Sequence, residues 1–132
     1  MKRKSISKKL RQSVFEKYKG HCAYCGKEID IKDMQVDHAI AYAQSVYGRD
    51  WEKVSEMIFD GTINNVDNLM PACRQCNFYK GIRDIEQFRA RIKNELEHTC
   101  RQTFQTRLAI QFGMIEYHEW DGKFYFEKTS NK

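Results

Sequence analysis

The apolar positions of the chain recur at helical spacing in three places. Leu10, Val14 and Tyr18 fall on one face of a helix that Ser7 is suited to begin and Gly20 to end. The same periodicity predicts two helices nearer the C-terminus. Their apolar stripes are Ile85, Phe88, Ile92 and Leu96, which follow a capping-box pattern at Asp84 and Gln87, and then Phe104, Leu108 and Phe112 before Gly113.

Short extended segments lie between and after these helices. We expect strands over residues 34–39 and 68–72, the second of which contains the only proline, Pro71. Residues 115–127 predict a β-hairpin, because Asp121-Gly122 is a strong turn signal between two short segments. From that hairpin, the alternating Phe124 and Phe126 are expected to cover the core.

The segment between residues 40 and 65 has a weaker pattern. Trp51, Val54 and Ile58 predict a short helix that Asp50 begins and Gly61 ends. We expect Trp51 to be a packing residue rather than a platform for a nucleic-acid base. The whole segment is interpreted as an insertion between the two predicted strands.

Four of the five cysteines form two Cys-x-x-Cys pairs, Cys22 with Cys25 and Cys73 with Cys76. Two such pairs supply the four thiolates of a closed, tetrahedral zinc site, which contributes folding free energy to a small domain. A redox role for either pair is the weaker alternative. Because four protein ligands leave no position open for water, this zinc is structural. Cys100 is expected to be an ordinary, partly buried thiol.

Composition indicates one globular domain. The chain has 132 residues, of which 41% are hydrophobic and 31% charged, so residues 1–132 are expected to fold together. No apolar run is long enough to cross a bilayer, and the basic N-terminus leads into no apolar signal segment. We therefore expect a cytoplasmic protein with no membrane partner, in which cysteines bind metal rather than form disulfides.

Basic residues are concentrated at the N-terminus of a chain whose formal net charge is +5. Such an arm suits binding to a phosphate backbone, because each neutralised phosphate releases counterions. A solvated tail explains the charge equally well. The arm consists of Lys2, Arg3, Lys4, Lys8, Lys9 and Arg11, all before the first acidic residue, Glu16.

Residues suited to phosphodiester hydrolysis lie at the two predicted strands. His38 is the natural base to activate water, since its ordinary pKa is near neutrality. Asp37 and Asn77 offer oxygen ligands of the kind that a divalent cation such as Mg²⁺ prefers. Asp37 and His38 would point to opposite faces of a regular strand, so the chain must bend or end there. The Asn68 amide is suited to hold that bend.

Together these residues resemble an HNH endonuclease of the ββα-metal type with a four-cysteine zinc site, as in phage-encoded and restriction enzymes. The implied fold is α+β, with a treble-clef-like ββα-metal core over residues 20–82 and flanking helices. The helical and hairpin extension would cover residues 84–128. The matching residues are Cys22, Cys25, Asp37, His38, Asn68, Leu69, Cys73, Cys76, Asn77 and Lys80.

The resemblance also implies roles for the residues of the motif. His38 matches the base, and Asn68 matches the residue that orders the catalytic loop. Asn77 with Asp37 would hold a single divalent cation, Mg²⁺ or Mn²⁺. The substrate would be DNA, cleaved to leave a 5′-phosphate and a 3′-hydroxyl.

Three basic residues near Asn77 are candidates for contacts with DNA phosphates, namely Arg74, Lys80 and Arg83. The chain departs from the family pattern after His38. Ala41 and Tyr42 occupy a region where proline is common, and the interval to Asn68 is long.

His21, His98 and His118 match no position of the motif and are interpreted as ordinary residues.

Three functions from different classes fit the sequence. The first is a metal-dependent DNA endonuclease or nickase, with components of phage packaging or restriction as partners. The second is a non-catalytic, zinc-stapled DNA-binding module, which leaves Asp37, His38 and Asn77 unexplained. The third is a zinc-dependent protein-interaction domain, which would have no salt-sensitive affinity for DNA.

Overall fold

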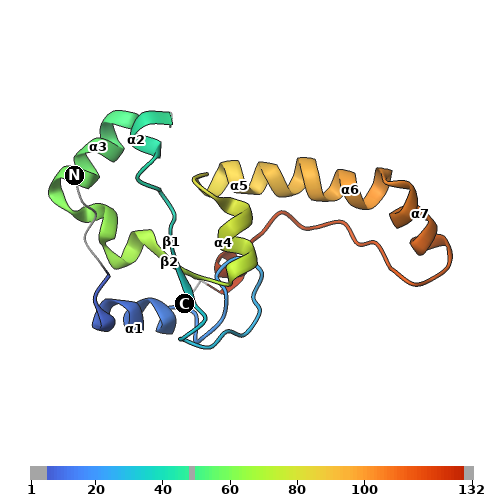
Figure 1. Cartoon of the computed structure of the whole chain (residues 1–132), viewed down its shortest axis with the longest axis horizontal. Helices are drawn as coiled ribbons and strands as arrows, with labels where there is room; N and C mark the ends of the chain where they lie inside the picture. The colour runs from blue at the N-terminus through green and yellow to red at the C-terminus, as the bar shows by residue number, and fades with distance from the viewer. Residues whose placement is uncertain (1–5, 48–49, 130–132) are drawn as a thin grey trace. The chain divides into compact units, whose positions relative to one another are not determined.

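The computed structural model describes residues 6–47 and 50–129 (Figure 1). The chain divides into two compact units, which are described separately. The first comprises Met1–Asp84 with Phe124–Lys132, and the second comprises Ile85–Lys123. In the described ranges, no helix has both the length and the apolar character that a membrane span requires.

The first unit contains a two-stranded antiparallel sheet. Strand β1 (Gln35–His38) pairs with β2 (Leu69–Ala72), and Asp37 lies opposite Met70 in the register. Both predicted strands are confirmed. Every residue of β2 is buried, whereas β1 is buried only at Asp37. The sheet ends at His38, and the next backbone amide, that of Ala39, donates to the Asn68 carbonyl at 2.8 Å.

Helix α1 (Lys8–Glu16) packs on this sheet as its apolar stripe predicts. Ser7 is the N-cap, and its hydroxyl accepts a hydrogen bond from the Leu10 amide at 3.0 Å. Val14 on α1 forms a buried core with Met34 and Leu69. Partly buried apolar side chains surround that core, namely Ile6, Leu10, Phe15, Ile29, Val36 and Val66.

Only part of the predicted basic arm can be placed. Lys2, Arg3 and Lys4 lie outside the described residues, and Lys8 and Lys9 are exposed on α1. Arg11 has a structural role instead. Its Nη2 donates hydrogen bonds to the carbonyl oxygens of Ile31 at 2.6 Å and Met34 at 2.7 Å, so it ties α1 to the loop before β1.

Helix α4 (Arg74–Lys80) follows β2 directly, which completes a ββα arrangement. Cys73 is its N-cap, with Sγ accepting from the Cys76 amide at 3.4 Å. Gly81 ends the helix, and its amide donates to the Asn77 carbonyl at 3.1 Å. The predicted α+β fold, with a ββα core and a four-cysteine cluster, is confirmed.

The segment between β1 and β2 is helical. It contains α2 (Gln44–Tyr47), α3 (Trp51–Asp60) and two short 3₁₀ helices, η1 (Thr62–Asn64) and η2 (Val66–Asn68). The predicted helix is confirmed, with Val54 buried and Gly61 at its end. Asp50 makes no side-chain capping bond there. The expectation that Trp51 packs is wrong, because this side chain is 55% exposed.

The predicted C-terminal hairpin is wrong. A turn does form, with Asp121 Oδ1 accepting from the Lys123 amide at 3.0 Å, but residues 115–124 contain no strand and Tyr125–Thr129 form helix α8. In a hairpin, the backbone amides of Tyr125 and Phe126 would bond to a neighbouring strand. In the structure they bond to the loop that contains the first cysteine pair. Tyr125 donates to the Tyr24 carbonyl at 3.1 Å and Phe126 to that of Ala23 at 2.8 Å.

The alternation of Phe124 and Phe126 therefore reflects packing on Tyr24 rather than strand pairing. Both rings meet the Tyr24 ring edge to face, with centroids 5.4 Å and 6.2 Å away. Phe124 is 1% exposed, so the expectation that it covers the core is confirmed.

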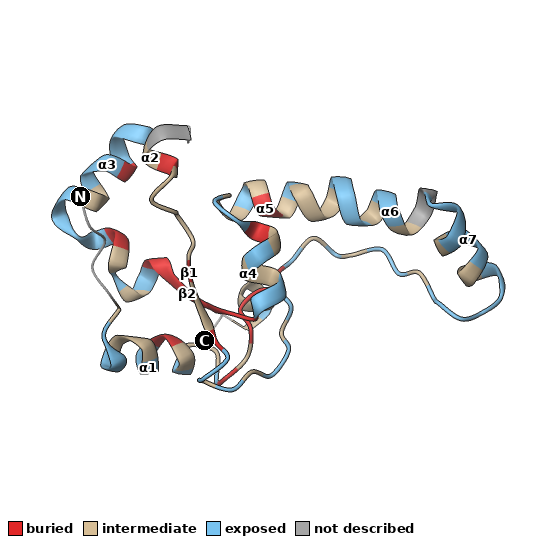
Figure 2. Ribbon diagram, viewed as in Figure 1, coloured by how far each residue is buried: buried red, intermediate tan, exposed pale blue. Residues whose placement is uncertain are grey.

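The second unit is built from consecutive helices. These are α5 (Ile85–Arg91), the π-helical η3 (Ile92–Leu96), α6 (Glu97–Gln102) and α7 (Phe104–Gln111). Both helices predicted here are confirmed. Figure 2 shows that burial is sparse in this unit: Phe88 is buried, but Leu96 is 44% exposed and α7 has no buried residue. Within the unit, Lys93 Nζ donates to the Trp120 carbonyl at 3.3 Å.

Candidate active site and metal centre

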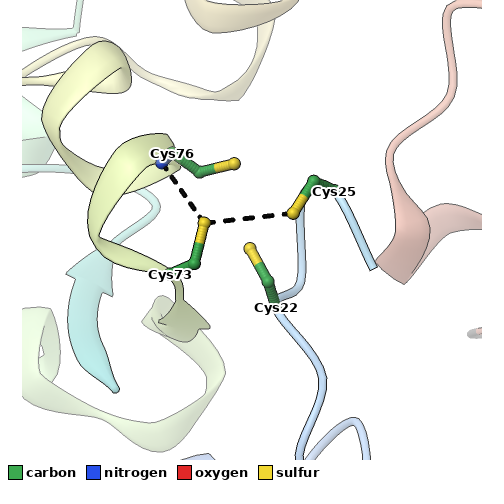
Figure 3. Close-up of side chains that lie close together, drawn as sticks. All are labelled: Cys22, Cys25, Cys73 and Cys76. Carbon is green, nitrogen blue, oxygen red and sulfur yellow. Dashed lines mark hydrogen bonds between the residues drawn. The ribbon is translucent and has the colours of Figure 1, made fainter. Parts of the chain in front are cut away.

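The four cysteines of the two pairs come together in the first unit. Their Sγ atoms all lie within 4.8 Å of one another, and those of Cys25 and Cys73 are 3.9 Å apart (Figure 3). Cys22 and Cys25 lie in the loop after α1, and Cys73 and Cys76 at the junction of β2 and α4. Four converging thiols at these separations have the donor set of a tetrahedral zinc site.

Backbone contacts hold the two pairs in place. The Ala23 amide donates to the Pro71 carbonyl at 2.8 Å, which joins the first cysteine loop to β2. Gly26 closes that loop with φ +82°, and its amide donates to the Cys22 carbonyl at 3.0 Å. A Cβ at this position would lie 2.6 Å from Tyr125 Cδ1, so both conformation and space require glycine.

The thiols also have the electrostatics of a cation site. The pKa of Cys22 is lowered to about 4, chiefly by a hydrogen bond from Cys76, and the pKa of Cys76 is raised by the same bond. Burial raises the pKa of Cys25. Thiolates so close together repel one another, so the cluster favours full ionisation only around a divalent cation.

Asp37 forms a buried ion pair with Lys80. The Asp37 side chain is 6% exposed and that of Lys80 is 0% exposed, with Lys80 Nζ 3.1 Å from Asp37 Oδ2 and 3.4 Å from Oδ1. Lys80 Nζ also donates to the His38 carbonyl at 2.9 Å. Burial raises the pKa of Asp37, an effect that the Lys80 charge opposes, and lowers the pKa of Lys80. The pair ties α4 to β1.

This arrangement changes the role that the sequence predicted for Lys80. A fully buried ammonium bonded to a carboxylate and a carbonyl is not placed to contact a DNA phosphate. Lys80 instead supports the strand that carries Asp37 and His38. Of the other two basic candidates, Arg74 is exposed on the first turn of α4, and Arg83 Nη1 donates to the Lys80 carbonyl at 3.2 Å.

Tyr24 connects the cysteine cluster to Asp37. Its hydroxyl donates to Asp37 Oδ2 at 2.5 Å, and it lies between the two cysteines of the first pair. Burial, and then the Asp37 charge, raise the pKa of Tyr24 well above its ordinary value. The loop that carries two cysteines of the cluster therefore also presents a hydroxyl to the carboxylate.

His38 is the last residue of β1 and points to different partners from Asp37, as the alternation of a strand requires. Its Nε2 lies 2.8 Å from Asn64 Oδ1, and its ring meets that of Tyr42 edge to face, with centroids 5.4 Å apart. Asn64 Nδ2 in turn donates to the Tyr42 hydroxyl at 3.0 Å. Among described residues, none bonds to His38 Nδ1.

Sequence reasoning missed Asn64 and Tyr24. Asn64 lies in the segment interpreted as an insertion, 26 residues from His38, and no spacing marks it as a partner. Tyr24 is an intervening position of a Cys-x-x-Cys pair, for which the spacing pattern specifies no side chain. Both are linked to the site only by the tertiary fold.

Asn68 holds the loop that follows His38. Its Oδ1 accepts from the Ile40 amide at 2.9 Å, and its Nδ2 donates to the carbonyl oxygens of Ile40 at 3.1 Å and Ile63 at 2.8 Å. The side chain is buried, so these bonds satisfy the polar atoms of the amide. They also join the loop to the 3₁₀ helix η1.

Asn77 lies on α4 one turn before Lys80, on the face of the helix that approaches β1. Its side chain is half-buried, and no hydrogen bond from the described part of the chain reaches its amide. The side-chain amide of Asn77 is therefore not used by the hydrogen bonds of the described chain.

Residues 22–83 match the family model for HNH endonuclease. This segment is an HNH domain. It runs from the first cysteine to Arg83 and includes both cysteine pairs, Asp37, His38 and the asparagines at 64, 68 and 77. Helix α1 and the second unit lie outside it. No curated protein and no solved structure gives a significant match to the chain. The HNH domain indicates a nuclease or DNA-binding function.

Proposed function

We propose that this protein is a metal-dependent DNA endonuclease or nickase that hydrolyses phosphodiester bonds. The observation that carries the proposal is the placement of His38 within an HNH domain. Its imidazole is held through Nε2, while Nδ1 has no partner among the described residues. In the proposed reaction, His38 Nδ1 takes a proton from the attacking water.

The residues around His38 fit a divalent cation. Asp37 Oδ1 has only a long, 3.4 Å contact with Lys80, and the side-chain amide of Asn77 makes no hydrogen bond with described residues. A carboxylate and an amide oxygen are the hard ligands that Mg²⁺ or Mn²⁺ prefers. Asp37 and Asn77 would hold the cation, which would supply charge stabilisation at the scissile phosphate and at the leaving oxygen.

Asn68 and Lys80 serve this site without touching the substrate. Asn68 holds the loop after His38, and Lys80 bonds to the His38 carbonyl. Together they limit the movement of the base relative to Asp37, as preorganised catalysis requires. Tyr24 adds a bond from the zinc-binding loop to the same carboxylate.

The exposed face of α4 is the proposed contact with DNA. Arg74 and Phe78 lie one turn apart on it, and Phe78 is 85% exposed. The Arg74 guanidinium is suited to contact a phosphate, and the Phe78 ring is suited to contact the edges of neighbouring bases. Arg83, which follows α4, is a second proposed phosphate contact.

The experiment is a plasmid-nicking assay on zinc-loaded protein with Mg²⁺ or Mn²⁺, an EDTA control and metal add-back. His38→Ala is expected to abolish cleavage while zinc content and folding stay intact. His118→Ala is the matched control, because His118 is a 76%-exposed histidine outside the HNH domain. Cleavage by His38→Ala at the wild-type rate would reject His38 as the base.

One observation favours a second function, a non-catalytic DNA-binding module. Asp37 already has Lys80 and Tyr24 as partners, so it has a structural role without any cation. Salt-sensitive DNA binding with no cleavage in any divalent metal would support this alternative. A setting in phage packaging or restriction stays a prediction from the sequence.

A further inference from the structure

The hydrogen bond between His38 and Asn64 assigns a function to a segment that the sequence marked only as an insertion. We propose that Asn64 is a positioning residue that fixes the tautomer of His38, with the proton on Nε2 and the lone pair on Nδ1. This inference rests on the proposed function, because a fixed tautomer matters only if His38 acts as a base.

The orientation of the Asn64 amide sets the direction of the bond. In this orientation Oδ1 lies 2.8 Å from His38 Nε2, and Nδ2 donates to the Tyr42 hydroxyl at 3.0 Å. An amide oxygen only accepts hydrogen bonds, so Nε2 must carry the proton. A neutral imidazole has one proton, which leaves Nδ1 unprotonated and able to accept the proton of a water molecule.

The backbone around Asn64 is held in place. Asn64 ends the 3₁₀ helix η1, and its amide donates to the Gly61 carbonyl at 3.1 Å. The preceding residue, Ile63, is 1% exposed, and its carbonyl accepts from Asn68 Nδ2 at 2.8 Å. Asn68 therefore holds both the loop after His38 and the helix that carries Asn64. Asn68 thus stabilises the positions of both His38 and Asn64.

Tyr42 holds the arrangement from the other side. Its ring packs edge to face on the His38 imidazole, and its hydroxyl accepts from Asn64. His38, Asn64 and Tyr42 thus form a closed set of three contacts. Two of its members lie between β1 and β2, so residues 40–65 complete the active site rather than extend the fold.

The first test reads the tautomer directly. Nitrogen-15 NMR of the zinc-loaded full chain, at a pH where the imidazole is neutral, reports which ring nitrogen carries the proton. The His38 signals are identified as those missing from His38→Ala. The proposal expects a protonated Nε2 in the wild type. A wild-type protein with the proton on Nδ1 would overturn it, whatever its activity.

The second test compares three variants. Asn64→Leu removes the acceptor, and we expect mixed tautomers and a roughly 10- to 100-fold lower kcat with little change in KM. Asn64→Asp keeps an acceptor oxygen and should restore the protonated Nε2. Asn65→Ala is the matched control, because its side chain caps the next 3₁₀ helix through the Asp67 amide and does not contact His38. Identical tautomers and kcat in Asn64→Leu and Asn65→Ala would overturn the proposal.

The two proposals can fail separately. If the wild type cleaves no DNA in any metal but has the expected tautomer, only the proposed nuclease function fails. If the wild type cleaves DNA and Asn64→Leu leaves the tautomer unchanged, only the role of Asn64 fails. Should Asn64→Leu not fold, Tyr42→Phe removes the hydroxyl that orients the amide and is expected to mix the tautomers.

Discussion

Lys80 Nζ lies 3.1 Å from Asp37 Oδ2, although the two residues are 43 positions apart in the sequence. The pair is buried, so removing one partner would leave the other as an uncompensated charge. It also joins α4 to the strand that carries His38. The pair is therefore important for stability and for the geometry of the proposed site.

Lys80→Met is expected to reduce the free energy of unfolding by about 3–5 kcal/mol, because the Asp37 carboxylate stays buried without its cation. Urea unfolding, followed by circular dichroism, measures the change. The double variant Lys80→Met/Asp37→Leu removes both charges and should regain much of the loss. A Lys80→Met variant as stable as the wild type would contradict the buried pair.

The raised pKa of Tyr24 predicts a loss of stability at alkaline pH. The folded-state pKa lies well above the ordinary 10.0, because burial and Asp37 disfavour the phenolate. Between these two pKa values the folded state binds more protons than the unfolded state. The contribution of Tyr24 to the free energy of unfolding is therefore at its maximum below pH 10. It decreases as the pH rises above 10, by at most about 1.4 kcal/mol per pH unit.

Tyr24→Phe isolates that contribution. The difference in unfolding free energy between wild type and Tyr24→Phe should be constant near neutrality and should decrease above pH 10. Urea titrations at several alkaline pH values provide the measurement. A difference that grew with pH would mean that the folded state favours the phenolate, against the geometry of the Tyr24–Asp37 bond.

Zinc removal is expected to unfold the first unit. Cys73→Ser should lose zinc and show a lower thermal midpoint, since the metal holds the loop after α1 against the start of α4. Metal content by mass spectrometry and thermal unfolding are the measurements. Cys100→Ser is the control, because Cys100 is a half-buried thiol outside the cluster. Equal zinc loss in both variants would argue against the four-cysteine site.

Gly26 and Gly61 allow backbone strain to be separated from a steric clash. Both have φ +82°, but a Cβ at Gly26 would meet Tyr125 Cδ1 at 2.6 Å, whereas Gly61 has nothing within 4 Å. Gly61→Ala should cost about 1–2 kcal/mol from strain alone. Gly26→Ala should cost more, as measured by urea unfolding. In a Tyr125→Ala background the two costs should become similar; persistence of the difference would exclude the clash as its cause.

Arg74 is expected to contact a DNA phosphate. Arg74→Gln should weaken DNA binding and lower the slope of log Kd against log salt concentration by about one. Fluorescence anisotropy at several salt concentrations measures both. Arg107→Gln is the matched control, because Arg107 is exposed on α7 outside the HNH domain. The same slope change in both variants would show a general charge effect rather than a contact on α4.

Local sequence pattern determined much of the framework of the first unit. The stripe with Leu10 and Val14 gives α1, and the spacing within each cysteine pair gives the two halves of the four-cysteine cluster. These features depend on residues within a few positions of one another, where spacing and backbone preference act directly. The Asp37-His38 dipeptide marked the candidate site for the same reason, since chemical type is visible without a fold.

Tertiary structure decided which residues meet across longer distances. The expected hairpin does not form, because the backbone amides of Tyr125 and Phe126 bond to carbonyl oxygens in the first cysteine loop. The alternation of apolar residues gives no information about acceptors so distant in the sequence. Lys80 has the same charge whether it contacts a phosphate or lies buried against Asp37. Asn64 becomes a partner of His38 only when the chain between the strands folds back. Pairing partners and burial are properties of the packed chain, so only the structure could assign them.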